Sequence, residues 1–168
     1  MTTIAYHHDS RTICTDSLTS TSQTIVSWAT RKCHRVDDGY VFASGNCAEI
    51  EHLLAHWHAN QFDKITCTFF FVDDEGAVFF GEIRHGRRFL EPLSLNWAIG
   101  SGANWAIAAM DFGRSAFEAV EYACLRDKSS GGTVMTYRHD ERSLWLHTPI
   151  TSNSSLIVNS LAPGNNWR

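Results

Sequence analysis

Thr2, directly behind the first methionine, carries two groups that can cooperate in nucleophilic catalysis. Once Met1 is removed, its hydroxyl and its free α-amine lie on adjacent carbons, so that one residue supplies both nucleophile and base. An α-amine has a pKa of about 7.7 to 8.0, and a neighbouring ammonium lowers that pKa and increases the uncharged fraction at neutral pH. This chemistry therefore requires a cation near Thr2, a carboxylate that holds the cation, and backbone N–H groups that face an oxyanion.

Candidates for these partners follow Thr2 in order along the chain. Asp16 ends the segment that we expect to pair with the first strand, and Lys32 begins the third predicted strand. Gly45 lies where the fourth predicted strand turns into a helix, and a helix N-terminus presents unpaired N–H groups to negative charge. The sequence thus contains every residue type that acyl transfer by a terminal threonine needs.

The histidines and the glycine-rich turns carry weaker signals. His52 and His56 have a spacing that can ligate zinc, but no HExxH motif accompanies them, and we interpret them, with His58, as surface histidines. The turns at 100–102 and 129–132 lack the glycine spacing and the lysine of nucleotide-binding loops. We therefore expect neither a metal nor a cofactor.

Composition restricts the class of protein. The chain has 168 residues, which fits a single domain over 1–168, and its 14 basic and 18 acidic residues give a net charge of -4. Nucleic-acid-binding proteins normally have a basic excess or patch, so we expect no nucleic-acid partner. The five cysteines are odd in number and never form CxxC, which indicates free thiols in a reducing compartment. No apolar run approaches the roughly 20 residues of a membrane span, and no secretory signal is evident, so we expect a cytoplasmic protein without a membrane segment.

Hydrophobic periodicity predicts the order of strands and helices. Apolar runs indicate strands at 3–7, 12–15, 32–36, 40–45, 65–72, 77–83 and 95–100. Helical spacing predicts a helix from about Cys47 to Asn60 and two further helical stretches, at 105–110 and 116–124. A terminal hairpin is expected from 132–138 and 143–147, and a polar surface segment from about Thr148.

This order of elements predicts an α+β fold. The strand runs, such as Phe69–Phe71, are too apolar for a sheet that has one face in water. Two sheets packed against each other, with helices on their outer faces, cover both faces of such strands. No internal repeat and no linker to a second domain interrupts the pattern.

Six short segments together resemble one protein family. They are TTIAY at Thr2, CTDS around Asp16, TRKCHRV around Lys32, FASGNCAE around Gly45, IGSGAN around Ser101 and RDKSSGG from Arg126. Similar segments occur in this order in proteasome β subunits and in the bacterial peptidase HslV, which are N-terminal-nucleophile threonine peptidases. The resemblance covers residues 2 to about 137. It implies a four-layer αββα sandwich, the fold of the N-terminal-nucleophile hydrolases.

The resemblance also implies a role for each matching residue. Thr2 would attack a peptide carbonyl and form an acyl-enzyme that water hydrolyses, with its own amine carrying the proton. Lys32 would tune Thr2, Asp16 would hold Lys32, and the N–H of Gly45 would bind the oxyanion. The supporting residues, which match those that bond the amine and its water, are Ser101, Asp127 and Ser130. The residues at the positions where the family builds its side-chain pocket are Thr30, His34, Ala43 and Cys47.

Family members work as stacked rings that enclose a chamber, and HslV receives unfolded chains from an ATPase. The resemblance therefore implies a homo-oligomeric ring, peptide or unfolded-protein substrates, and an ATPase unfoldase as a candidate partner. Only Met1 precedes Thr2, as in HslV, so no propeptide is expected.

Two alternative functions remain open. One is a non-catalytic ring subunit that keeps the fold for assembly or binding, which loss of Thr2, Lys32 or Asp16 would favour. The other is an N-terminal-nucleophile amidase that acts on small molecules.

Overall fold

The computed structural model describes residues 2–63 and 65–138, and these residues form eleven strands and three helices. In chain order the elements are β1 (Thr3–His7), β2 (Thr12–Thr15), β3 (Thr19–Ser20), β4 (Ile25–Ser27), β5 (Cys33–Val36), β6 (Gly39–Ser44), α1 (Cys47–Ala55), β7 (Thr68–Asp73), β8 (Val78–Arg84), β9 (Arg87–Pro92), β10 (Trp97–Gly100), α2 (Ala103–Asp111), α3 (Ala116–Arg126) and β11 (Met135–Arg138). Every strand and helix predicted within the described residues is present. The strands at 3–7 and 12–15 have the predicted bounds, and the other elements have shifted ends.

A four-stranded sheet has the strand order β10-β1-β2-β11, and all of its neighbouring strands are antiparallel. The predicted first hairpin is present, with Ile4 opposite Thr15. On the other edge of β1, β10 brings Gly100 opposite Thr3. The start of β1 therefore lies between the end of β2 and the end of β10.

The second sheet has five antiparallel strands in the order β5-β6-β7-β8-β9. Its central strand, β7, is buried on both faces. Phe69 and Phe71 belong to an apolar cluster with Leu53 of α1, whereas Phe70 belongs to a cluster with Ile4 of the other sheet. The alternation explains why this aromatic run needs apolar cover on both sides.

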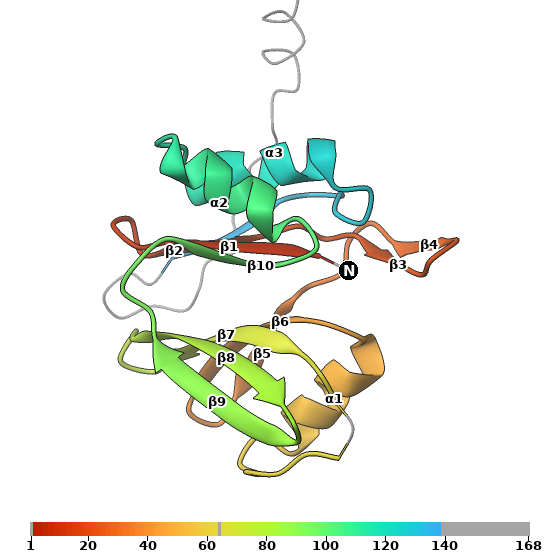
Figure 1. Cartoon of the computed structure of the whole chain (residues 1–168), viewed down its shortest axis with the longest axis vertical. Coiled ribbons are helices and arrows are strands. Elements are labelled where there is room, and N and C mark those ends of the chain that lie inside the picture. The colour runs from red at the N-terminus through yellow and green to blue at the C-terminus, as the bar shows by residue number, and fades with distance from the viewer. Residues whose placement is uncertain (1, 64, 139–168) are drawn as a thin grey trace, which may run out of the picture.

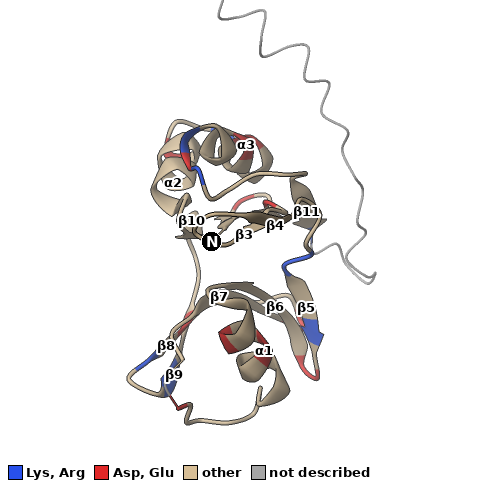
Figure 2. Cartoon of the chain, turned by 90° about the vertical axis from the view of Figure 1, so that its right-hand side faces the viewer, with Lys and Arg blue, Asp and Glu red and all other residues tan. Residues whose placement is uncertain are grey.

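The helices cover the outer faces of the two sheets. Figure 1 shows α2 and α3 on the four-stranded sheet and α1 against the far face of the five-stranded sheet. Figure 2, turned by 90°, shows the two sheets facing each other, with Lys and Arg scattered over both halves of the drawn molecule. The fold is thus α+β with antiparallel sheets, as the sequence predicts. None of the helices within 2–63 and 65–138 is long and apolar enough to cross a membrane.

The helix predicted to reach Asn60 ends at Ala55. His56 has φ −121° and ψ 37°, which leaves the helical region, although its N–H still bonds to the His52 carbonyl. Trp57, which completed the apolar period in the sequence, lies beyond the helix but remains buried. Its indole N–H donates to Asp38 at 2.7 Å. The period therefore predicted the burial of Trp57 correctly and the length of the helix wrongly. The bond to Asp38, in the turn between β5 and β6, helps to hold Trp57 in the core.

Three strands were not predicted. β3 and β4 form a short hairpin in a polar segment, and β9 is an edge strand that contains Arg87 and Arg88. Charged residues suit an edge strand because one of its sides stays open to solvent.

β11 forms the first half of the predicted terminal hairpin and pairs with β2. The other half, at 143–147, and the polar segment from Thr148 lie outside the described residues.

Candidate active site

Thr2 and Asp16 are brought together by the first hairpin. Thr2 directly precedes β1, and Asp16 directly follows β2. The antiparallel pairing continues one step beyond the strands, because the Asp16 N–H donates to the Thr3 carbonyl at 3.0 Å. In return, the Thr3 N–H donates to Oδ1 of Asp16 at 2.9 Å. The register of β1 and β2 thus fixes the carboxylate beside the start of the chain.

Lys32 reaches this corner from the second sheet, where it directly precedes β5. Its Nζ lies 2.5 Å from Oδ1 of Asp16 and donates to the Leu18 carbonyl at 2.9 Å. The Thr2 hydroxyl contacts both partners, since it accepts from Nζ of Lys32 and donates to Oδ1 of Asp16. Exposed fractions are 3% for Thr2, 0% for Asp16 and 7% for Lys32. The three residues predicted to form the centre of the site therefore meet in a nearly dry corner.

Burial and the ion pair shift the pKa of Lys32 in opposite directions. Burial lowers the pKa of Lys32, because water no longer solvates the ammonium, and the charge and hydrogen bond of Asp16 partly offset this effect. The net result is a lowered pKa. The Asp16 carboxylate is held by two further N–H donors, those of Gly131 at 3.0 Å and Leu18 at 3.3 Å. A lysine of lowered pKa that touches a hydroxyl can assist its deprotonation and stabilise the resulting negative charge.

The three predicted supporting residues form a second cluster. Oδ2 of Asp127 accepts from the hydroxyls of Ser101 at 2.5 Å and Ser130 at 2.6 Å. Burial alone would raise the pKa of Asp127, but these two bonds and one from the Ser129 N–H lower it below its usual value. Asp127 is therefore a stable anion at neutral pH.

This second cluster contacts the start of β1. The Ser101 hydroxyl lies 3.4 Å from the Thr2 carbonyl oxygen, and the hydroxyls of Ser130 and Thr3 are 2.6 Å apart. Ser101 follows β10, whereas Ser130 lies in the loop after α3. Two loops that are distant in sequence thus contact the adjacent residues Thr2 and Thr3. Thr2 has partners on its hydroxyl and on its carbonyl oxygen.

Gly100 permits this close approach. Its φ is +95°, and a Cβ atom there would lie 2.0 Å from the Thr2 carbonyl oxygen. The same Cβ would lie 3.1 Å from the hydroxyl of Ser44, the last residue of β6. The end of β6 therefore approaches the backbone of Thr2 from the second sheet.

Gly45 follows Ser44 and lies next to this corner. It is exposed, and the residue after it, Asn46, caps α1 by accepting from the Ala48 N–H at 2.9 Å. Among the described residues, the Gly45 N–H has no hydrogen-bond partner. An N–H group that is free and next to a helix N-terminus suits an oxyanion, so the assignment of Gly45 stays a prediction with consistent geometry.

The four residues predicted to line a side-chain pocket differ in their surroundings. Ala43 is buried in the cluster beside α1, Cys47 is exposed as the first residue of that helix, and Thr30 and His34 are half-buried. Burial, with the nearby charge of Arg31, lowers the pKa of His34. None of the four lines the cavity found beside the candidate site. Their role therefore stays a prediction.

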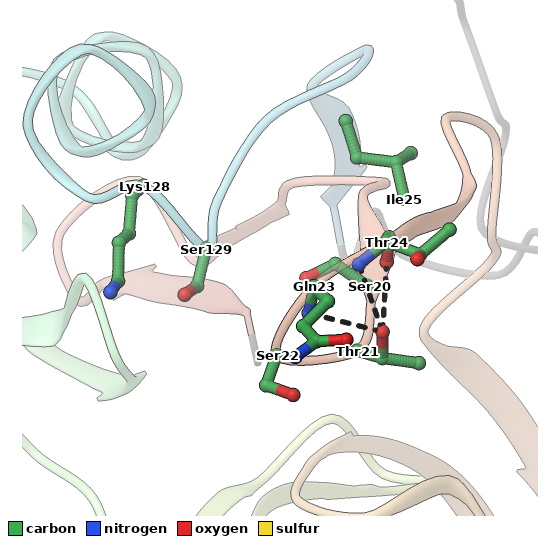
Figure 3. A pocket seen from close by; sticks show the side chains of 8 residues that line it. All are labelled: Ser20, Thr21, Ser22, Gln23, Thr24, Ile25, Lys128 and Ser129. Carbon is green, nitrogen blue, oxygen red and sulfur yellow. Dashed lines mark hydrogen bonds between the residues drawn. The ribbon is translucent and has the colours of Figure 1, made fainter.

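That cavity lies between the β3–β4 hairpin and the loop after α3, and Figure 3 shows its lining. No sequence pattern predicted this cavity, because the hairpin segment was not predicted to form strands. The contacts that Thr3 and Leu18 make with the site were also not predicted from the sequence. The doublet of threonines at the start could have suggested Thr3, whereas a backbone carbonyl such as that of Leu18 has no sequence signal.

The histidines of α1 lie outside this site. The rings of His52 and His56 are 4.4 Å apart, and Nδ1 of His56 bonds to the His52 carbonyl. In the part of the chain that the structure describes, no group of three or more His, Cys, Asp or Glu side chains could hold a metal ion.

Comparison with known proteins supports the fold. No protein-family model matches the chain, and no curated protein matches it. Among solved structures, it is similar to a Thiobacillus denitrificans protein named BPH, with a TM-score of 0.60, and to BPH in complex with epoxomicin, with a TM-score of 0.59. Both are 19% identical in sequence, and the alignments cover 82% of this chain and 96% or 97% of the BPH chains. The chain therefore shares the fold of BPH.

Proposed function

We propose that this protein is a threonine peptidase with a four-layer αββα fold, in which Thr2 becomes the nucleophile after removal of Met1. One observation carries the proposal: the buried Thr2 hydroxyl contacts both members of the Lys32–Asp16 ion pair. The fold shared with BPH supports it, because BPH has been solved with epoxomicin, a proteasome inhibitor.

The proposed reaction begins with the free α-amine of Thr2. The hydroxyl oxygen attacks a peptide carbonyl while its proton passes to the amine, and the carbonyl oxygen gains a negative charge to which the Gly45 N–H donates a hydrogen bond. The C–N bond then breaks, and the leaving amine takes the proton from the Thr2 ammonium. Water, deprotonated by the same amine, hydrolyses the resulting ester and releases a carboxylic acid. Lys32 stabilises negative charge on the Thr2 oxygen during both steps.

The substrates and the assembly of the proposed enzyme follow from the resemblance in sequence. We infer peptides or unfolded proteins as substrates, a homo-oligomeric ring in the cytoplasm, and an unfoldase as a candidate partner. Contact among Thr2, Lys32 and Asp16 counts against the alternative of a non-catalytic ring subunit. No contact in the described residues favours a small-molecule amidase, which a monomeric active protein would support.

Intact mass, measured before and after incubation with a peptide epoxyketone, tests the proposal. The expected result is loss of Met1 followed by one adduct per chain at Thr2, because the adduct requires a hydroxyl and a free amine on one terminal residue. Thr2→Ala should form no adduct and hydrolyse no peptide, whereas the control Thr68→Ala, in β7, should behave like the unmodified sequence. Normal peptide hydrolysis by Thr2→Ala would reject Thr2 as the nucleophile.

A further inference from the structure

A cavity of about 450 Å³ is lined in part by Lys128 and Ser129, which lie between the site residues Asp127 and Ser130 in the sequence. One wall is the β3–β4 hairpin, and the other is the start of the loop that follows α3. The lining residues are Ser20, Thr21, Ser22, Gln23, Thr24, Ile25, Lys128 and Ser129. Figure 3 shows Lys128 and Ser129 on one side and the hairpin on the other. The lining residues carry hydroxyl groups, one carboxamide, one ammonium and the apolar side chain of Ile25, and none of them carries a carboxylate.

Both walls are continuous with residues that contact Thr2 or its partners. The N–H groups of Ser17 and Leu18 donate to the Gly131 carbonyl at 3.0 and 2.8 Å, which ties the two walls together at their base. Leu18 also accepts from Lys32, and it directly precedes β3. On the opposite wall, Ser129 donates its N–H to Asp127 at 3.1 Å. Hydrogen bonds and short stretches of chain therefore connect both walls of the cavity to partners of Thr2.

The hairpin wall is internally ordered. The Thr21 hydroxyl accepts from the N–H groups of Thr24 at 2.9 Å and Gln23 at 3.3 Å, bonds that Figure 3 marks as dashed lines. The Thr21 N–H also donates to the Thr24 carbonyl at 2.8 Å. A loop held by its own hydrogen bonds binds a ligand with a smaller loss of conformational entropy than a loose loop.

Lys128 gives the cavity its charge. Its side chain is exposed, and it forms no ion pair with any described carboxylate. The neighbouring Asp127 does not neutralise it by direct contact, because the hydroxyls of Ser101 and Ser130 occupy that carboxylate. An anionic group in the cavity would meet an ammonium and several hydroxyl donors, a combination that forms charge-assisted hydrogen bonds.

We propose that this cavity binds a carboxylate of the substrate, and that Lys128 determines a preference for peptides that carry one there. The inference rests on the proposed peptidase function and specifies its substrates. Two sources present the same chemistry: the side chain of an Asp or Glu residue near the cleaved bond, and the free C-terminus of a short peptide.

Matched peptides distinguish the two sources. One pair differs by Glu against Gln at each position flanking the cleaved bond in turn, and the other pair by a free against an amidated C-terminus. We expect kcat/KM to favour the acidic member of at least one pair by about three- to tenfold, the range for one charge-assisted contact that solvent partly reaches. Lys128→Met should abolish this ratio, and Lys128→Glu should invert it. A ratio that stays the same in both variants would overturn the proposal.

A charge control and a binding measurement complete the test. Arg87→Met removes an exposed cation from β9, in the other sheet, and should leave the acidic-to-neutral ratio unchanged. Binding of the same peptides to Thr2→Ala, measured by calorimetry with and without Lys128→Met, reports on the cavity without catalysis. If peptides bind with the acidic preference but the unmodified chain hydrolyses none of them, the peptidase proposal fails and carboxylate binding stands. If hydrolysis occurs without any acidic preference, the peptidase proposal stands and the cavity proposal fails.

Discussion

Nζ of Lys32 lies 2.5 Å from Oδ1 of Asp16, and solvent reaches only 8% of one side chain and none of the other. Asp16→Asn would leave the Lys32 ammonium buried without its counterion, so we expect the free energy of unfolding to fall by about 3–5 kcal/mol. The pKa of Lys32, already lowered by burial, would fall further because the attraction of Asp16 is lost. Denaturant unfolding measures the first effect, and peptide hydrolysis should be lost with the ion pair.

An exposed ion pair provides the control for this prediction. Arg35 and Asp74 are also 2.5 Å apart, but half or more of each side chain is exposed. Asp74→Asn should leave the unfolding midpoint nearly unchanged, because solvent screens the pair. Equal destabilisation by Asp16→Asn and Asp74→Asn would contradict the importance of burial.

Substitutions at two glycines with positive φ should distinguish the cost of backbone strain alone from the cost of strain combined with a steric clash. At Gly113, with φ +78°, an added Cβ meets nothing within 4 Å, so Gly113→Ala should cost only about 1 kcal/mol of strain. At Gly100, the Cβ would lie 2.0 Å from the Thr2 carbonyl oxygen. Gly100→Ala should therefore cost about 3 kcal/mol or more and displace Thr2, abolishing hydrolysis. Thermal unfolding and kcat/KM of both variants check the prediction, which is wrong if Gly100→Ala retains full activity.

Asp127 should influence activity more than stability. The carboxylate accepts from Ser101 and Ser130 at one oxygen and from the Ser129 N–H at the other. An amide has only one acceptor oxygen, and its NH2 group cannot accept a hydrogen bond, so at least one of these bonds is lost. We expect Asp127→Asn to lower kcat/KM by about a hundredfold, as for other groups that position a nucleophile. Asp111→Asn, at the exposed end of α2, is the matched control and should behave like the unmodified chain. Unchanged kinetics in Asp127→Asn would remove it from the site.

The stability contributed by the N-terminus of α3, the helix that precedes Asp127, should depend on pH. Ser115 and Glu118 form a capping box, in which the carboxylate accepts from the Ser115 N–H at 3.0 Å. These bonds lower the pKa of Glu118 below 4.5. Their stabilising effect is therefore fully present above that value and is lost as the pH falls through the lower pKa of the folded state.

Ser115→Ala tests this dependence. We expect it to lower the free energy of unfolding by about 1 kcal/mol at neutral pH, the usual effect of losing an N-cap. The difference from the unmodified chain should shrink at an acidic pH below the lowered pKa of Glu118, where the carboxylate is protonated in both the folded and the unfolded state. Denaturant unfolding at both pH values measures it, and a difference that grows at low pH would contradict the assigned role of Glu118.

The sequence by itself determined the elements whose signal is local. The alternation in 3–7 and 12–15 predicted the hairpin of β1 and β2, and that hairpin already puts Asp16 beside Thr2. The run Phe69–Phe71 predicted a strand that is covered on both faces, because side chains alternate along any strand. The six ordered segments also indicated the residues that could form a site.

Only the tertiary structure decided which of these residues meet. Lys32 and Asp16 come from different sheets, and no local pattern encodes the packing that brings Nζ to Oδ1. Trp57, beyond the end of α1, bonds to Asp38 of a distant turn, and the cavity beside Lys128 depends on a hairpin with little apolar pattern. Contacts of this kind depend on distances between elements far apart in the chain, and residue spacing along the sequence does not contain them.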